Sequence, residues 1–386
     1  MPAKAKVPAI RFKGFNDAWE QRELWECFDE RQERSAIGEL ISVTINDGIR
    51  KFEELGRHDN SSDDKSHYKR VEVGDIAYNS MRMWQGASGY SPYSGILSPA
   101  YTVIIPKDGV DSVFFSYAFK RPQMIHTFQL RSQGITSDTW NLKFPAFSEI
   151  ETMLPTHSEQ KKIGEYFVKL DNLITLHQRK LLKLKNVKKA MLEKMFPKNG
   201  STVPEIRFAG FTDAWEQREL NAWADRYDNL RVPITASDRV TGSTPYYGAN
   251  GIQDYVEGYT HDGEFILVAE DGASDLKNYP VQYVNGRIWV NNHAHVLQAK
   301  KEIADNKFLK YVISQTNIEP YLVGGGRAKL NADTMMRICI IAPENLEEQK
   351  QLGTLFQRLD NLITLHQRKY EKLQNLKKAC LEKMFV

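Results

Sequence analysis

The chain has 386 residues, of which 41% are hydrophobic and 26% charged, with a formal net charge of +3. This length accommodates two domains of ordinary size, and the composition is typical of soluble globular proteins. The sequence has neither an apolar run of about 18 residues nor a signal-peptide core, so it predicts neither a membrane span nor export. Cys27, Cys339 and Cys380 lie far apart, which excludes a disulfide framework or zinc motif and favours a reducing cytoplasm.

The chain contains a long internal repeat, which is the first feature to interpret. The block AIRFKGFNDAWEQREL (9–24) returns as EIRFAGFTDAWEQREL (205–220), and LDNLITLHQRK occurs identically at 170–180 and 359–369. Similar flanks extend the second pair to 157–196 and 346–385. The segments between these blocks, roughly 25–150 and 221–340, show little likeness. The sequence therefore predicts a duplicated frame that carries two unlike inserts.

Each insert contains strand and helix patterns. Runs rich in β-branched and aromatic residues, bounded by Gly, Asn, Asp or Pro, predict strands. They lie at 39–45, 71–79 and 100–106 in the first insert, and at 264–272, 280–284 and 287–299 in the second. Helices are predicted at 113–122 and 303–315, and a glycine-containing loop follows at 132–140 and 323–332. Each insert is thus expected to be a compact α+β domain.

Each repeated block predicts one long helix with a heptad seam, because apolar residues recur at alternating steps of four and three. The first seam runs through Ile163, Phe167, Leu170, Ile174, His177, Leu181, Leu184, Lys188, Met191 and Met195. The second runs through Leu352, Phe356, Leu359, Ile363, His366, Tyr370, Leu373, Lys377, Cys380 and Met384. Pro155, Pro197 and Pro343 mark the boundaries. Helices of about 35–40 residues would be roughly 55 Å long.

A single helix cannot bury such a seam, so the two copies are expected to pack against each other. Short connections would make them antiparallel, and an approximate two-fold axis would then relate the two halves. His177 and His366 at seam positions indicate polar residues that set the register of a coiled coil. Charge favours the same blocks, with +7 over 159–198 and +3 over 347–386, although a solvated helix face is an equally good interpretation.

The inserts carry residue types that read nucleic acid, since Arg, Asn and Gln can pair with base edges and aromatic rings can stack on bases. For any single residue, a core or turn role is the simpler alternative. The candidates are Arg82, Trp84, Gln85, Tyr90, Gln133, Thr136, Tyr246, Tyr247, Asn250, Gln253, Asn291, Asn292, Arg327 and Lys329.

Catalytic signatures are missing from the sequence. It has no GxxxxGK[ST] phosphate loop, HExxH or GxSxG motif, and GGGR (324–327) lacks the Lys-Ser/Thr of a phosphate loop. Methyltransferase and nuclease motifs are absent as well. His293 and His295 are two residues apart but have no further ligands at metal spacing, so a structural role is predicted and no metal. This organisation indicates a recognition and assembly subunit rather than an enzyme.

The repeated blocks, the WEQREL entry to each insert, YYGANGI (246–252) and WVNNHAHV (289–296) resemble the specificity subunit of type I restriction-modification systems. The resemblance covers essentially the whole chain. It implies an α+β fold of two globular target-recognition domains joined by two long antiparallel coiled-coil helices. The expected parts are 1–155 and 199–343 for the recognition domains, and 156–198 and 344–386 for the spacer helices.

The resemblance also implies a function. Each recognition domain would read one half of a split site in double-stranded DNA, and helix length would set the unread gap. The frame would dock two methylation subunits, and restriction subunits would join the full complex. No cofactor is expected in this chain, because S-adenosylmethionine and ATP/Mg would belong to the partner subunits. Two alternatives remain: a coiled-coil scaffold without a DNA role, and a fused methyltransferase or nuclease with degenerate motifs.

Overall fold

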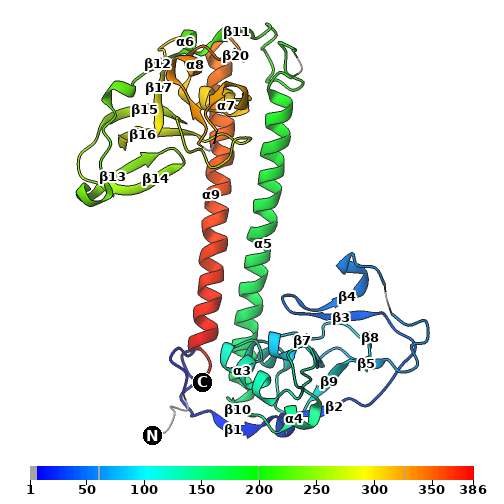
Figure 1. The fold of residues 1–386 in the computed structure, drawn as a ribbon. Helices are drawn as coiled ribbons and strands as arrows, with labels where there is room; N and C mark the ends of the chain where they lie inside the picture. Colours follow the sequence, from blue (N-terminus) through cyan, green and yellow to red (C-terminus); the bar gives the residue numbers. More distant parts are fainter. Residues whose placement is uncertain (1–6, 60, 199, 326) are drawn as a thin grey trace. The chain divides into compact units, whose positions relative to one another are not determined.

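The computed structural model describes residues 7–59, 61–198, 200–325 and 327–386 (Figure 1). Two compact units share the chain: unit 1 comprises Met1–His177 with Lys369–Val386, and unit 2 comprises Gln178–Arg368. The long helices α5 (His157–Met195) and α9 (Leu346–Lys383) have 39 and 38 residues, as the repeat predicted. Each contributes one part to each unit. The helices of the described residues include none that is both long and apolar enough to cross a membrane.

Unit 1 is built from short antiparallel strands and short helices beside the long ones. A four-stranded sheet has the order β2-β9-β6-β7, and three further pairs are β1–β10, β3–β4 and β5–β8. The strands are β1 (Glu20–Glu23), β2 (Phe28–Glu30), β3 (Ile41–Thr44), β4 (Gly48–Lys51), β5 (Lys69–Val71), β6 (Ile76–Asn79), β7 (Ser88–Tyr90), β8 (Gly95–Leu97), β9 (Tyr101–Pro106) and β10 (Glu151–Leu154). The helices are α1 (Leu24–Cys27), α2 (Ser112–Ala118), α3 (Pro122–Arg131) and α4 (Phe144–Ser148), with 3₁₀ turns η1 (Phe52–Leu55) and η2 (Met83–Gln85).

An aromatic core joins the first insert to the long helices. Phe114, Phe119 and Phe147 are buried in one cluster with Phe167 of α5. Phe385, just after α9, packs against Phe167 with 5.9 Å between ring centroids. Because the same cluster includes side chains from the insert and from both helices, the insert cannot move on them without exposing apolar surface.

Unit 2 contains a larger sheet of six strands in the order β12-β17-β15-β16-β13-β14, antiparallel except for the β13–β16 pair. The strands are β11 (Glu216–Glu219), β12 (Ala224–Arg226), β13 (Thr241–Gly248), β14 (Gly251–Val256), β15 (His261–Ala269), β16 (Val281–Val290), β17 (Ala294–Ala299), β18 (Leu322–Val323), β19 (Lys329–Leu330) and β20 (Cys339–Ala342). The helices are α6 (Leu220–Trp223), α7 (Asn306–Gln315) and α8 (Ala332–Met336), with 3₁₀ turns η3 (Asp228–Leu230), η4 (Ala236–Asp238) and η5 (Glu319–Tyr321).

Within each unit the two long helices pack antiparallel, which confirms that prediction. In unit 1, Asp171 of α5 pairs with Lys377 of α9, while Tyr166 earlier in α5 meets Cys380 later in α9. Unit 2 shows the same reversal. All ten seam positions in each helix are buried or partly buried, whereas most of their neighbours are exposed. An α+β fold with an internal repeat is therefore what the chain adopts.

The arm that precedes each insert is tied to both long helices. In unit 2, Arg207 donates two hydrogen bonds to Glu348 near the start of α9, at 2.6 and 2.8 Å. Ile206 N–H donates to the Lys194 carbonyl at the end of α5. Unit 1 repeats the arrangement with Arg11, Glu159, Ile10 and Lys383. Both glutamates have fully buried side chains, so these ion pairs fix the entry to each insert.

Two expected strand boundaries were wrong. The predicted strands at 280–284 and 287–299 are instead divided at 291–293, because β16 continues through Asn285 and Gly286. Gly286 has φ +98° and pairs with Gly263, which lets the strand pass without a turn. The predicted strand at 71–79 is interrupted by a turn at Gly74, whose φ is +103°, between β5 and β6.

Candidate nucleic-acid interface

Each insert is held on its long helix by the same set of contacts. In unit 2, the Asp305 N–H donates to Gln349 Oε1 at 3.0 Å, and the Tyr311 hydroxyl donates to Asp360 Oδ2 at 2.6 Å. Between them on α9, a Cβ added to Gly353 would lie only 2.7 Å from a backbone nitrogen of α7. The unit 1 counterparts are Asp111 with Gln160, Gly164 against α2, and Tyr117 with Asp171. These contacts fix the orientation of each insert on its helix.

The polar residues of the seam complete this contact. Lys188 of α5 pairs with Asp360 of α9, and Lys310 of α7 donates to the same carboxylate at 3.1 Å. Burial opposes ionisation of Asp360, but the two ammonium groups outweigh it and its pKa is lowered. Burial likewise lowers the pKa of Lys310. In unit 1, Lys377 pairs with Asp171 in the same way. The lysines that interrupt each seam therefore bind one insert and both helices together.

In unit 1, the turn between β6 and β7 meets the loop that follows α3. Trp84 lies edge-to-face with Trp140, with 5.2 Å between ring centroids, and the Leu142 N–H donates to the Ser80 carbonyl. The structure thus brings together five predicted residues: Arg82, Trp84 and Gln85 on the turn, and Gln133 and Thr136 on the loop. Tyr90 is not among them, because it pairs with Ile76 at the far end of β7 from this turn.

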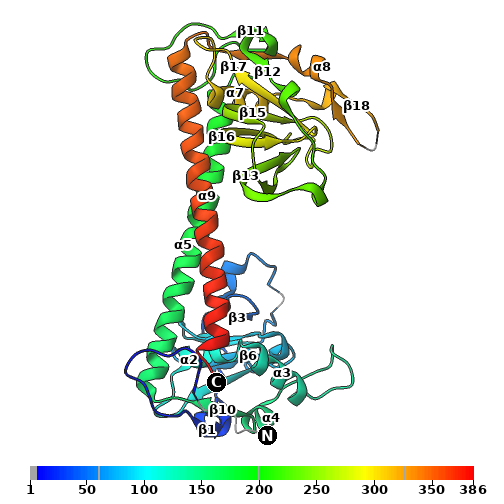
Figure 2. The same ribbon diagram turned by 90° about the vertical axis from the view of Figure 1, so that its left-hand side faces the viewer.

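In unit 2, four chain segments converge on one surface. The turn between β13 and β14 carries Asn250, whose side chain donates to the Gly272 carbonyl and accepts from the Ser274 N–H. Asp271, next to Gly272, forms a bridge with Lys329 of the β18–β19 hairpin. Asn291 Nδ2 reaches Gln253 Oε1 at 3.4 Å. This surface is polar and rich in turns, and the β18–β19 hairpin projects from it (Figure 2).

The predicted residues of unit 2 differ in accessibility. Asn250, Gln253, Asn292, Arg327 and Lys329 are exposed, and Tyr247 is partly buried. Tyr246 is only 1% exposed, and its hydroxyl bonds the backbone of Ile234. Asn291 is 3% exposed and its Oδ1 accepts from the His293 N–H. Tyr246 and Asn291 were predicted to contact DNA, but both side chains are buried and bond to the backbone of neighbouring loops.

Asp271 also belongs to this surface, although the sequence did not indicate it. Asp271 Oδ1 accepts from Arg327 at 3.0 Å and lies 2.6 Å from His293 Nδ1. Arg327 keeps 62% of its side chain exposed, so Asp271 holds a guanidinium that still faces solvent. No local pattern marks Asp271, because Arg327 lies 56 residues away and a carboxylate by itself repels phosphates.

His293 and His295, two residues apart, do not share a site. His295 is buried, and its ring nitrogens lie 2.7 Å from Asp228 Oδ2 and 2.8 Å from the Leu330 carbonyl. Ligand-type atoms of Asp228, Glu270 and His295 lie within 4.8 Å of one another, as in a metal site. However, Arg231 and Lys329 already neutralise Glu270, at 2.7 and 2.9 Å. The cluster therefore ties β17 to the β18–β19 hairpin through its own bonds.

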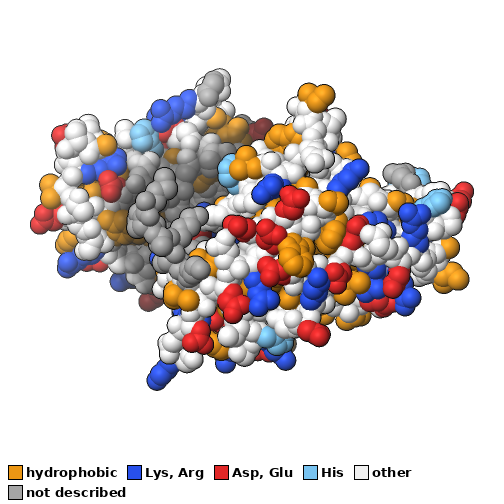
Figure 3. All heavy atoms as spheres, turned by 90° about the horizontal axis from the view of Figure 1, so that it is seen from below, with side chains coloured by type: hydrophobic (Ala, Val, Ile, Leu, Met, Phe, Trp, Pro, Cys, Tyr) orange, Lys and Arg blue, Asp and Glu red, His pale blue; other side chains and the backbone are white. Residues whose placement is uncertain are grey.

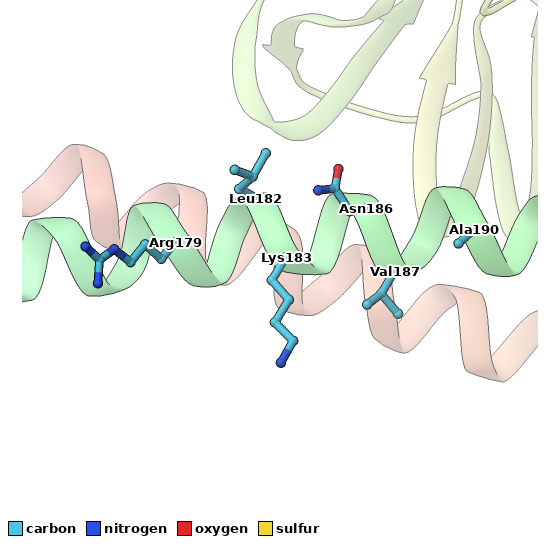
Figure 4. Close-up of a pocket in the computed structure, with 6 residues that line it drawn as sticks. All are labelled: Arg179, Leu182, Lys183, Asn186, Val187 and Ala190. Carbon is cyan, nitrogen blue, oxygen red and sulfur yellow. The ribbon is translucent and has the colours of Figure 1, made fainter. Parts of the chain in front are cut away.

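The outer faces of the long helices carry exposed leucines at equivalent positions. Leu173 and Leu176 of α5 are 43% and 44% exposed, and Leu362 and Leu365 of α9 are 42% and 45% exposed. Further along α5, a shallow hollow of about 460 Å³ is lined by Arg179, Leu182, Lys183, Asn186, Val187 and Ala190 (Figure 4). Apolar side chains flanked by cations are thus available for a partner on each helix.

The end face of unit 1 lacks such a pattern in its described residues. Figure 3 shows acidic and basic side chains interspersed there, with small groups of hydrophobic side chains between them. On β1, for example, Arg22 pairs with Glu20 at 2.8 Å. A face of alternating charge gives little attraction to a phosphate backbone. The converging loops are therefore the better candidates for nucleic-acid contact.

The comparisons with known proteins agree with this organisation. The family model described as Type I restriction modification DNA specificity domain matches residues 45–186 and again 212–375. A chain of Haemophilus influenzae described as a type I restriction enzyme specificity subunit is 44% identical over 146 residues, which are 38% of this chain and 37% of that relative. The MjaVIII specificity subunit of Methanocaldococcus jannaschii is 23% identical over 354 residues, covering 82% of this chain and 81% of the relative.

A solved structure shares the fold. The crystal structure of a type I restriction-modification S subunit from M. genitalium matches with a TM-score of 0.67 and 14% identity, covering 98% of this chain and 99% of that chain.

Proposed function

The chain belongs to the family of type I restriction modification DNA specificity domains, and we propose that it is the DNA-recognition subunit of a type I restriction-modification complex. Each insert reads one half of a bipartite site in double-stranded DNA. The observation that carries this proposal is that unlike inserts present polar, turn-rich loops while repeated contacts hold both to the same frame. Two different readers on one frame fit a site with two different halves.

The reading itself is selective binding. Exposed Gln253 and Asn292 offer amide groups that suit adenine edges, and Arg327 suits guanine or phosphate. The amide of Asn250 is bonded to Gly272 and Ser274, so it supports the turn beside them. In unit 1, Arg82, Gln85 and Gln133 take the corresponding roles beside Trp84. Lysines such as Lys329 add affinity by releasing counterions from phosphates, without reading sequence.

The frame docks the other subunits. The exposed leucine pairs on α5 and α9 occupy equivalent positions, so two copies of one methylation subunit can bind them in the same way. These partners carry S-adenosylmethionine and flip the target adenine, and restriction subunits add ATP/Mg-dependent translocation and cleavage. The length of the long helices sets the unread gap between half-sites. The complex acts in the cytoplasm, and this chain supplies no catalytic residue.

A coiled-coil scaffold without a DNA role is the alternative. It accounts for α5 and α9 but not for the two loop surfaces on the inserts. The decisive test sequences adenine methylation in genomes of cells with and without this gene, with the methylation subunit present in both. We expect a split motif that disappears with the gene. Unchanged methylation, while the purified chain shows no salt-dependent affinity for DNA, would favour the scaffold.

Exchanging residues 25–150 for another insert gives a second test. One half of the methylated motif should change while the other remains. Loss of both halves together, in a variant that still assembles with its partners, would contradict the model of two independent readers.

A further inference from the structure

Unit 1 presents one apolar side chain in an unusual position. Ile135 is 100% exposed, at the tip of the loop between α3 and α4. Figure 2 shows this loop standing out from the body of unit 1 beyond α3. The corresponding position of unit 2, between η5 and α8, is the glycine-rich β18–β19 hairpin, whose described loop residues include the exposed Arg327. The loop is thus a feature of the first reader alone.

Hydrogen bonds and a close backbone approach shape the loop that carries Ile135. Gln133 and Asn141 exchange two backbone hydrogen bonds at its base, of 3.0 and 2.8 Å. Across the tip, the Thr139 N–H donates to the Thr136 carbonyl, and Thr139 Oγ1 accepts from the Thr136 N–H. Gly134 has φ +145° and lies so close to Thr139 that a Cβ would come within 2.6 Å of its carbonyl oxygen. This loop conformation leaves the β-branched side chain of Ile135, which has few rotamers, fully exposed to solvent.

The surroundings of Ile135 are suited to nucleic acid. Trp140 of the loop packs on Trp84, which anchors the loop beside the predicted base-reading turn. Two cationic residues, Arg131 and Lys143, flank the loop, and the loop itself contains one carboxylate, that of Asp138. Arg131 also lies 3.7 Å from Glu149. Leu130 nearby is 71% exposed. Two aliphatic side chains surrounded by hydroxyl and amide groups offer less apolar area than the core of a protein–protein interface, so a protein partner is the weaker interpretation.

From these observations we propose that Ile135 is a wedge that enters the base stack of the first half-site and unstacks one base step. This inference rests on the proposed function of unit 1 as a DNA reader. Aliphatic side chains inserted between bases kink the duplex and favour steps that unstack easily, above all pyrimidine–purine steps. Ile135 thereby adds selectivity at a position where no side chain need hydrogen-bond a base.

The test uses the full chain assembled with its methylation partner, on the split site found by methylation sequencing. 2-Aminopurine replaces each adenine of the two half-sites in turn, because its fluorescence rises when a base is unstacked. We expect one bright position besides the base flipped by the partner. Ile135→Ala should dim that position to the level of free duplex. It should also weaken binding about ten-fold, because the shorter side chain buries less apolar surface between the bases. Ile135→Leu should restore both.

Ile37→Ala is the matched control, since Ile37 is also an exposed isoleucine of unit 1, at 88%, on a different loop. It should leave fluorescence and affinity unchanged. Three results would overturn the wedge: brightness that survives Ile135→Ala, weaker binding with every position dark in the native complex, or failure of the Ile135→Ala chain to assemble with its partner. The last would reassign the loop to a protein contact. A native complex without site preference would instead refute the proposed function.

Discussion

Replacing Asp360 by Asn removes a carboxylate that pairs with two ammonium groups. Lys188 and Lys310 have side chains 22% and 15% exposed, and that of Asp360 is 27% exposed. Breaking a buried ion pair by deleting one partner costs about 3–5 kcal/mol, and the partial exposure reduces this to roughly 2–4 kcal/mol. Lys188→Met should cost only about 1 kcal/mol, because Asp360 keeps Lys310 and the Tyr311 hydroxyl and the seam gains an apolar side chain.

Hydrogen exchange of peptides from α7 (Asn306–Gln315) measures the loss of stability in each variant. It reports the free energy of local opening in unit 2 and does not require unit 1 to unfold. The pKa of Asp360 is lowered, so its stabilisation is present above the ordinary carboxyl pKa and is lost as pH falls through the folded value. The deficit of Asp360→Asn should therefore shrink below about pH 4. Equal costs for Asp360→Asn and Lys188→Met, or a deficit independent of pH, would refute the shared-carboxylate account.

Three further outcomes are expected. Arg207→Ala strands a fully buried carboxylate and should destabilise its unit by about 3–5 kcal/mol in thermal unfolding, whereas Arg218→Ala, on an exposed pair, should cost under about 1 kcal/mol. Arg327→Ala should weaken binding of the second half-site about 5- to 150-fold by fluorescence anisotropy, and leave the first half-site intact. At pH 8, iodoacetamide should label exposed Cys339 but not Cys27, whose thiol pKa burial raises to about 11, as peptide mass spectrometry would show.

The long helices could be predicted from sequence because their information is local. A spacing of four and three residues determines which side of a helix is apolar, and the seam positions are those with reduced exposure. What Lys188 does could not be read in the same way. Its ion-pair partner Asp360 lies 172 residues away on α9, and its ammonium group lies over the ring of Tyr311 on the second insert. The sequence alone therefore shows only an interruption of the seam. The role of a polar seam residue depends on its contacts with the opposing helix, which the sequence does not show.

The tyrosines of β13 illustrate why the recognition surface was harder to predict. Neighbouring strand residues face opposite sides, so a one-residue shift exchanges a buried ring for an exposed one. A register shift between Tyr246 and Tyr247 in the β13–β14 ladder decides which ring enters the core. Nothing in TPYYGANG marks that shift, and the two residues were predicted alike. The structure buries Tyr246 under Arg239, with 4.2 Å from guanidinium to ring.

The unlike inserts nonetheless share one short pattern, Asp-x-x-Phe-x-x-Tyr, at 111–117 and 305–311. The Asp caps α2 or α7 by accepting from the Phe N–H, and the Tyr reaches the aspartate of the long helix. Fewer than two turns of helix thus supply both the cap and this docking contact, and the recognition loops, which lie outside them, can differ. An insert from another chain should seat on this frame if it brings that pattern, whatever its recognition loops contain. If such an insert seats, the specificity of this frame can be exchanged through few side chains.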